Sequence, residues 1–203
     1  MAVLREELVS LSFDNRELDK FYCFLDLVKT RMDRRFEHVI DLCAGNGLAG
    51  FLFACHGLAE RTTLVDISKP KRFSKIQRLF DKYGLKFDYI EMDINSSDIH
   101  KKLDFRNSLA IAVHACGDLS DRILHLALDS NLPFALMPCC HENQFAGYSL
   151  KNPPDSRLLM YPERSDYFDL VRLQYMRENG YACDLFEIPR KITPKNKVLI
   201  GVK

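Results

Sequence analysis

A glycine-rich turn between an apolar run and a helical pattern is the strongest chemical signal in the sequence. The segment Val39-Ile-Asp-Leu-Cys-Ala-Gly45-Asn-Gly47-Leu-Ala-Gly50 predicts a buried strand, a tight turn and the start of a helix. Glycines let the backbone turn sharply and approach a ligand closely, where a Cβ atom would collide. The glycine spacing fits the dinucleotide pattern G-x-G-x-x-G, and Asp66 lies at about the distance expected for a ribose-binding acid. The pattern therefore predicts a nucleotide-containing cofactor without choosing among such cofactors.

The residues before the first glycine argue against a dinucleotide. Asp41 ends the predicted strand, and Cys43 and Ala44 intervene before Gly45. A carboxylate at that point would repel a pyrophosphate, but it could hold the ammonium group of an amino acid, directly or through water. The chain also leaves no room for the substrate domain of a dehydrogenase. An NAD-type oxidoreductase is therefore the disfavoured alternative.

Two further polar segments follow predicted strands. They are His114-Ala-Cys-Gly-Asp118-Leu-Ser-Asp121 and Pro138-Cys139-Cys-His-Glu142. The carboxyl ends of the strands are where open α/β sheets assemble their sites. His114, Asp118 and Cys139 are therefore the candidate catalytic residues.

The elements that must position these residues form an alternating pattern. From residue 38 onward, short apolar runs are each followed by a turn signal and a helical period, which is typical of a parallel sheet with crossover helices. A helix near residues 162–179 then precedes two runs joined by a turn, which predicts an antiparallel pair at the sheet edge. Residues 141–161 form a long irregular stretch and a candidate functional loop. The expected strands cover residues 38–42, 62–65, 87–92, 109–114, 134–137, 181–188 and 197–202.

The strand-end motifs resemble those of a known family. The segment Asp41-Leu-Cys-Ala-Gly45-Asn-Gly47 resembles the first motif of class I S-adenosylmethionine-dependent methyltransferases. Leu64-Val-Asp66 resembles the second, whose acid accepts hydrogen bonds from the ribose hydroxyls, and Glu91-Met-Asp93-Ile94 resembles the third, whose acid lies near the adenine amino group. The resemblance implies S-adenosyl-L-methionine as cofactor. The residues implied to bind it are Asp41, Cys43, Gly45, Gly47, Asp66, Ile67, Asp93, Ile94 and His114.

The same resemblance implies a fold and a domain organisation. The fold is an α/β, Rossmann-like three-layer αβα sandwich, with a mostly parallel seven-stranded sheet and an antiparallel edge strand. Residues 1–36 are expected to be a helical lead-in packed on the core, with a cap at Asp14 or Asn15. Residues 37–203 are expected to form the Rossmann-like methyltransferase domain.

The substrate side is similar to one methyltransferase group. The pattern H-x-C-G-D-x-[ST]-D followed by C-C-H, with the terminal Ile192-Thr-Pro-Lys-Asn-Lys, resembles acceptor-stem tRNA ribose 2′-O-methyltransferases and the methyltransferase domains found beside glutathione-transferase-like C-terminal domains. The resemblance covers about residues 38–203 and implies RNA as substrate, with tRNA ribose 2′-O leading. This chain lacks the zinc-binding segments of the tRNA enzymes, so a small molecule or a protein side chain stays open.

Three other interpretations compete at the same residues. Pro138-Cys139 resembles the Pro-Cys motif of RNA cytosine-C5 methyltransferases, where a thiolate attacks the pyrimidine ring, although Cys116 lacks a preceding proline. Imidazole and thiolate groups could bind zinc, but their spacing matches no paired framework, and no metal is expected. A non-catalytic cofactor-binding subunit would keep the acids and glycines and lose the polar cluster.

Basic residues gather in two places. Arg72, Lys75, Arg78 and Lys82 follow the ribose acid at helical spacing, which fits either phosphate contacts or an ordinary solvated face. The C-terminal third is also locally basic. Its basic residues include Arg157, Arg164, Arg172, Arg177, Arg190, Lys191, Lys195 and Lys197.

Composition sets the outer limits. The chain has 203 residues, enough for one core, and its 29 Lys and Arg nearly balance 28 Asp and Glu, so no global field draws it onto nucleic acid or a membrane. We expect no secretion signal, because acids follow the first residues, and no transmembrane helix. Seven cysteines, an odd number spread through apolar segments, predict free thiols in a soluble, cytoplasmic protein. Nothing in the sequence predicts an oligomeric state.

Overall fold

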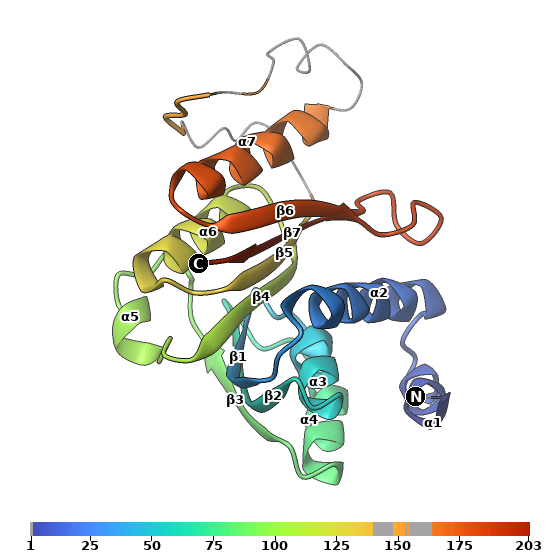
Figure 1. Cartoon of the computed structure of the whole chain (residues 1–203). Coiled ribbons are helices and arrows are strands. Elements are labelled where there is room, and N and C mark those ends of the chain that lie inside the picture. Colours follow the sequence, from blue (N-terminus) through green and yellow to red (C-terminus); the bar gives the residue numbers. More distant parts are fainter. Residues whose placement is uncertain (1, 140–147, 153, 155–163) are drawn as a thin grey trace.

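One mixed sheet organises the protein. The computed structural model describes residues 2–139, 148–152, 154 and 164–203, and its seven strands lie in the order β3-β2-β1-β4-β5-β7-β6 (Figure 1). Strands β1 to β5 are parallel, and β7 runs antiparallel to both β5 and β6. This arrangement confirms the predicted Rossmann-like fold. The strands are β1 (Phe36–Leu42), β2 (Ala59–Asp66), β3 (Lys86–Glu91), β4 (Ser108–Ala115), β5 (Phe134–Pro138), β6 (Ala182–Glu187) and β7 (Lys197–Val202).

Helices cover both faces of the sheet. Successive residues of a strand point to opposite faces, so Val39 joins one apolar cluster and Ile40 the other. The first cluster includes residues of α1 to α4, and the second includes residues of α5 to α7, which makes three layers (Figure 1). The helices are α1 (Ala2–Ser10), α2 (Asn15–Met32), α3 (Leu48–Cys55), α4 (Phe73–Lys82), α5 (Ile99–Lys102), α6 (Asp118–Ser130) and α7 (Arg164–Glu178).

The N-terminal segment is helical and packs on the sheet's α3 side. Asp14 caps α2 by accepting hydrogen bonds from the N–H groups of Arg16 at 2.8 Å and Glu17 at 3.3 Å, which confirms the predicted cap. Phe24 of α2 lies against Phe53 of α3, with ring centroids 5.9 Å apart. The predicted domain boundary after residue 36 stays a prediction.

The basic face of α4 binds the N-terminal segment. Arg72 donates to the carbonyl of Ser12 at 2.6 Å, and Lys75 donates to that of Leu11 at 2.8 Å. Lys82 forms an ion pair with Glu7 at 2.6 Å. Carbonyl groups at the C-terminal end of a helix lack a hydrogen-bond donor within the helix. Arg72 and Lys75 supply donors to the carbonyl groups that follow α1. The sequence suggested either phosphate contacts or a solvated helix face for these residues. The structure shows instead that Arg72, Lys75 and Lys82 bind the N-terminal segment of the same chain.

The expected helix and loop near the substrate side are only partly described. Helix α7 confirms the predicted helix near residues 162–179, whereas the candidate loop at residues 141–161 lies mostly outside the described residues. Within the described part of the chain, no helix combines the length and the apolar character that crossing a membrane requires.

Candidate active site

Backbone geometry and packing explain the glycines between β1 and α3. Gly45 and Gly47 have φ angles of 53° and 80°, in the left-handed region that suits glycine. A Cβ atom at Gly47 would lie 2.8 Å from a methyl carbon of Leu64, and one at Gly50 would lie 2.5 Å from the other. A Cβ atom at Gly45 would meet nothing within 4 Å. The turn is therefore closed against β2 on one side and open at Gly45.

Asp66, at the end of β2, fixes this turn. One oxygen of its half-buried carboxylate accepts the Gly45 N–H at 2.7 Å, and the other accepts the N–H of Ile67 at 2.8 Å. Each carboxylate oxygen can accept a further hydrogen bond, so Asp66 can still bind a ligand hydroxyl. The next side chain, Ile67, is 72% exposed and offers an apolar surface beside the open turn.

Three acids meet around Cys43, which follows β1. Burial raises the pKa of the Cys43 thiol to about 12, and the charges of Asp66, Asp41 and Asp93 add to the rise. The carboxyl ends of β1, β2 and β3 thus carry three acids whose charges all act on Cys43, and we call these residues the acidic cluster. Their role in binding stays a proposal.

Asp41 lies under the turn. It is 1% exposed, and its carboxylate accepts the N–H of Gly50 at 2.9 Å. Burial, with the nearby charge of Asp66, raises the pKa of Asp41 to about 7. Its observed partner is therefore the first turn of α3, and the predicted contact with an ammonium group stays a prediction.

Tyr89 of β3 is a part of the site that sequence reasoning missed. Its hydroxyl donates to the carbonyl of Gly45 at 2.9 Å, and its ring centroid lies 4.5 Å from that of Phe73. Burial and the charge of Asp66 raise its pKa. The half-buried pattern of β3 was the available signal, because a strand tyrosine needs a partner for its hydroxyl.

The third predicted motif divides between surface and core. Asp93 is exposed and accepts the N–H of Asn95 at 2.9 Å. Ile94 is 3% exposed and packs in the cluster that includes Ile99. Little of the Ile94 side chain is therefore available to contact a ligand.

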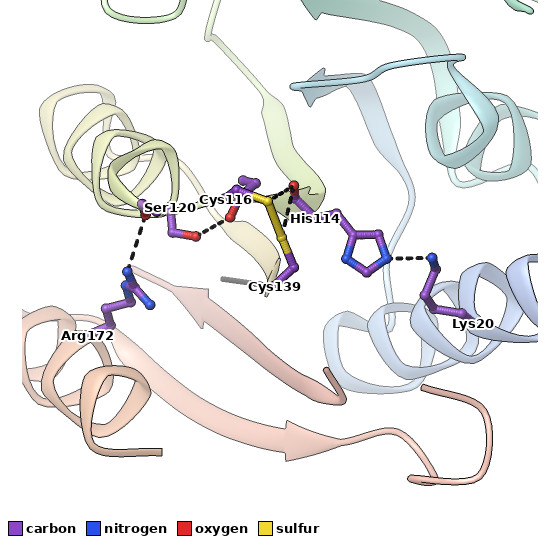
Figure 2. Close-up of a disulfide and its surroundings, with 8 residues drawn as sticks. Lys20, His114, Cys116, Ser120, Cys139 and Arg172 are labelled. Atoms are coloured by element: carbon purple, nitrogen blue, oxygen red, sulfur yellow. Dashed lines mark hydrogen bonds between the residues drawn. A yellow bond between two sulfur atoms is a disulfide. The ribbon is translucent and has the colours of Figure 1, made fainter. Parts of the chain in front are cut away.

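His114 is turned out of β4 by a bulge. The pairing of β4 with β5 shifts register between Val113 and Ala115, and His114 has φ 67°. A bulge redirects the side chain it carries, and Figure 2 shows the imidazole pointing away from the neighbouring sulfurs and toward α2. There its Nε2 lies 2.5 Å from Nζ of Lys20. Sequence reasoning missed Lys20, which is 94 positions away along the chain.

Burial changes the proton affinities of this pair. It lowers the pKa of His114 to about 4, and the charge of Lys20 contributes. Burial also lowers the pKa of Lys20, against the opposing charge of Glu17. The pair thus brings two groups with lowered pKa values into contact at this strand end.

A disulfide joins the strand ends on the other side of His114. Cys116 follows β4, Cys139 follows β5, their Cα atoms are 5.5 Å apart, and their sulfurs bond to each other (Figure 2). Both sulfurs lie within 3.5 Å of the His114 carbonyl oxygen. The expectation of free thiols is therefore wrong for these two cysteines, because the carboxyl ends of β4 and β5 bring them into bonding distance.

The disulfide limits the chemistry proposed for Cys139. A sulfur in a disulfide cannot act as a nucleophilic thiolate, so the covalent alternative applies only to the reduced protein. The free cysteines in the described part of the chain are Cys23, Cys43, Cys55 and Cys183. Cys140 and His141 lie outside it. Among the residues described, no three His, Cys, Asp or Glu side chains gather in a way that could hold a metal.

A buried ion pair supports the loop after β4. Arg172 of α7 donates to Asp121 of α6 at 2.7 Å and to Asp169 at 3.2 Å, and it also reaches the carbonyl of Gly117. Arg172 is 2% exposed and its charge is taken up by these carboxylates, so it adds nothing to the basic character of the surface in the C-terminal third. Asp118, the third candidate catalytic residue, is exposed at the first residue of α6.

Comparison with known proteins assigns the chain to a family. A family model described as a methyltransferase domain matches residues 15–145, more than half of the chain, and the protein belongs to this family. Its fold is shared with a methyltransferase whose solved structure contains S-adenosyl-L-methionine. The human glutathione S-transferase C-terminal domain-containing protein is 21% identical over 207 residues, which cover 86% of this chain and 31% of that protein. The chain thus spans less than a third of the length of this curated relative.

Solved structures share the fold. An rRNA methylase from Streptococcus thermophilus superimposes with a TM-score of 0.53 at 14% identity, covering 84% of this chain and 88% of that one. The Streptococcus pneumoniae protein Sp1610, in complex with S-adenosyl-L-methionine, gives a TM-score of 0.50 at 13% identity and covers 87% and 69%.

The residues at the turn fit this cofactor. The open face at Gly45, the Asp66 carboxylate and the exposed Ile67 supply close backbone approach, an acceptor for hydroxyls and an apolar surface. These are the groups that a nucleoside needs. We propose that Asp66 would hold the ribose and Ile67 and Asp93 the adenine.

We expect Asp66→Ala to lose measurable binding of S-adenosylhomocysteine. The substitution removes charge-assisted hydrogen bonds and frees the Gly45 N–H, which together should weaken binding by about 100-fold or more. Calorimetric titration measures the effect, and circular dichroism checks the fold. Asp88→Ala, which removes an exposed carboxylate of the neighbouring strand β3, is the matched control. Wild-type affinity in Asp66→Ala would remove Asp66 from the site.

Proposed function

We propose that this methyltransferase acts on RNA, with a ribose 2′-hydroxyl of tRNA as its leading acceptor. S-adenosyl-L-methionine supplies an electrophilic methyl group. The contact between Lys20 and His114 carries the proposal, because methylation of a hydroxyl requires a group that can take a proton at the acceptor. Methylation of pyrimidine C5 would instead require a thiolate, and both described cysteines at this position are in a disulfide.

Similarity supports RNA as the substrate class. The segment from His114 to Asp121 resembles that of tRNA ribose methyltransferases, and the fold is shared with an rRNA methylase. The substrate of this chain is an inference from these likenesses. A small-molecule acceptor remains the alternative that the RNA experiment below would support.

The turn between β6 and β7 offers phosphate contacts at the same edge. Because β7 is antiparallel to β5, its first residues lie beside the carboxyl end of β5. The turn is held by Asn196, whose side chain donates to the carbonyl of Ile188 at 2.9 Å. Lys191 and Lys195 are exposed in this turn. We propose that these two lysines contact RNA phosphates.

Other basic residues of the C-terminal third are paired within the protein. Arg177 binds Asp184 at 2.6 Å, and Lys197 binds Glu187 and Asp166. A groove of about 300 Å³ between α2 and the end of β6, lined in part by Leu27 and Ile188, lies beside this turn.

The acceptor atom is tested by product analysis. The purified protein is incubated with bulk tRNA and S-adenosyl-L-methionine, and the digested nucleosides are resolved by mass spectrometry, with Asp66→Ala as the inactive control. We expect 2′-O-methylated nucleosides and no denaturation-resistant adduct with 5-fluoropyrimidine RNA, with or without reductant. A C5-methylated pyrimidine, or an adduct lost on Cys139→Ala, would establish covalent catalysis. An absence of methylated RNA would favour a small-molecule acceptor.

Phosphate contacts are tested by salt dependence. We expect the double variant Lys191→Ala, Lys195→Ala to weaken tRNA binding and to reduce the slope of log K against log salt concentration by about 1 per lysine. Filter binding over a salt series measures the slope. The charge-matched control is Lys86→Ala, Lys203→Ala, at the opposite edge of the sheet. Equal losses in the two double variants would contradict the placement of RNA on the β6–β7 turn.

A further inference from the structure

We propose that Lys20, rather than His114, takes the proton of the acceptor during methyl transfer, and that His114 positions its amine. The proposal rests on the proposed hydroxyl acceptor. It assigns a chemical role to a residue of the N-terminal helix α2, which the strand-end motifs do not include.

The geometry of the pair is set by two elements. Helix α2 is held by the buried side chains of Leu18 and Phe24, and Lys20 projects from the same part of the helix to Nε2 of His114. His114 reaches that position through the bulge and a left-handed backbone conformation. Such a conformation is unfavourable for a residue with a side chain, and strained residues of this kind cluster at functional sites. The same bulge brings the imidazole to Lys20.

The proton of the pair belongs to Lys20. Two nitrogen bases in hydrogen-bond contact need one proton between them, and an ammonium group can only donate. The pKa of His114 is about 4, so the imidazole is neutral at physiological pH and accepts from Lys20 through Nε2. While Lys20 is an ammonium group, neither residue can take a further proton at this contact. When Lys20 loses its proton, its amine becomes the base, because the imidazole, whose pKa is about 4, is too weak a base to compete near neutral pH.

The surroundings of Lys20 act on its amine in both directions. Lys20 is half-buried, and burial lowers its pKa. The ring of Phe21, whose centroid lies 5.0 Å from Nζ, instead stabilises the ammonium form. Among the charged groups of the described residues, Glu17 on the same helix opposes the effect of burial, and Glu17 itself faces Arg72 at 3.5 Å. From β4 the group that faces Lys20 is the neutral imidazole, and the disulfide beyond it is uncharged. A lysine shifted toward neutrality in this way is suited to general-base catalysis.

The proposed step balances in atoms and charge. The neutral Lys20 amine accepts the hydroxyl proton as the new oxygen–methyl bond forms and the sulfur–methyl bond of the sulfonium breaks. The products are a methyl ether, S-adenosylhomocysteine and the Lys20 ammonium group. The ammonium then returns its proton to solvent, and His114 holds the side chain through the contact at Nε2.

The protonation of Lys20 can be measured without any RNA. Trace acetylation of the wild-type protein with acetic anhydride across a pH series, followed by peptide mass spectrometry, gives the titration midpoint of each reactive lysine. We expect the midpoint of Lys20 to lie below that of the exposed Lys86 in the same sample. A Lys20 midpoint equal to that of Lys86 would overturn the proposal, whatever the RNA experiments show.

The catalytic role is measured on tRNA by pH profiles. We expect wild-type kcat to rise with pH, and we expect the midpoint of that rise to equal the titration midpoint of Lys20 found by acetylation. Lys20→Arg, which cannot lose its proton, should lower kcat at least about 100-fold with unchanged S-adenosylhomocysteine affinity. Lys29→Arg, an exposed position of the same helix, should leave kcat and the profile unchanged. Retained kcat in Lys20→Arg contradicts the role. If the Lys20 titration midpoint is lowered but the wild-type protein does not methylate tRNA, the result contradicts the assignment of RNA as substrate and leaves the role of Lys20 standing.

Discussion

The hydrogen bond from the Gly45 N–H to the Asp66 carboxylate is the contact on which the rest of the site depends. It ties the turn after β1 to the end of β2, at 2.7 Å, while Tyr89 holds the Gly45 carbonyl from β3. Three neighbouring parallel strands thus fix the two peptide units that flank the Gly45 Cα atom. Because a Cβ atom at Gly47 or Gly50 would collide with Leu64, the same turn sets how closely α3 approaches the sheet. The open side at Gly45 follows from these constraints.

Charge is divided along the carboxyl edge of the sheet. The ends of β1, β2 and β3 carry the acidic cluster around Cys43, and the end of β4 carries the Lys20–His114 pair. We propose that the acidic part binds the cofactor, whose ammonium and hydroxyl groups need acceptors, and that the basic pair serves the methyl acceptor. The disulfide between Cys116 and Cys139 joins the ends of β4 and β5, next to the bulge that directs His114.

Local patterns predicted much of the fold and the cofactor side of the site. The strands were predicted because apolar runs of parallel strands are continuous and bounded by turn residues, and the Asp14 cap was predicted because its residue type suits a helix start. The three acids were found because each lies at or just after the end of a predicted strand. These features depend on residues close together in the chain.

The features that sequence reasoning missed depend on tertiary contacts. Lys20 contacts His114 because of a bulge in β4, and no residue type in the sequence predicts that bulge. Arg172 is buried against carboxylates of two helices, α6 and α7. The basic face of α4 was predicted to be either solvated or RNA-binding. Its partners are backbone carbonyl groups of the N-terminal segment, and side-chain patterns in the sequence do not reveal such partners. Free thiols were expected because spacing along the chain does not show that two strand ends will bring Cys116 and Cys139 together.

The most direct test of this account is a crystal structure of the protein with S-adenosylhomocysteine. We predict the ribose hydroxyls within about 3 Å of the Asp66 carboxylate, the adenine beside Ile67 and Asp93, and the sulfur on the side of the turn that faces Lys20 and His114. A ligand bound away from the Gly45 turn, or a sulfur directed away from the Lys20–His114 pair, would contradict the account.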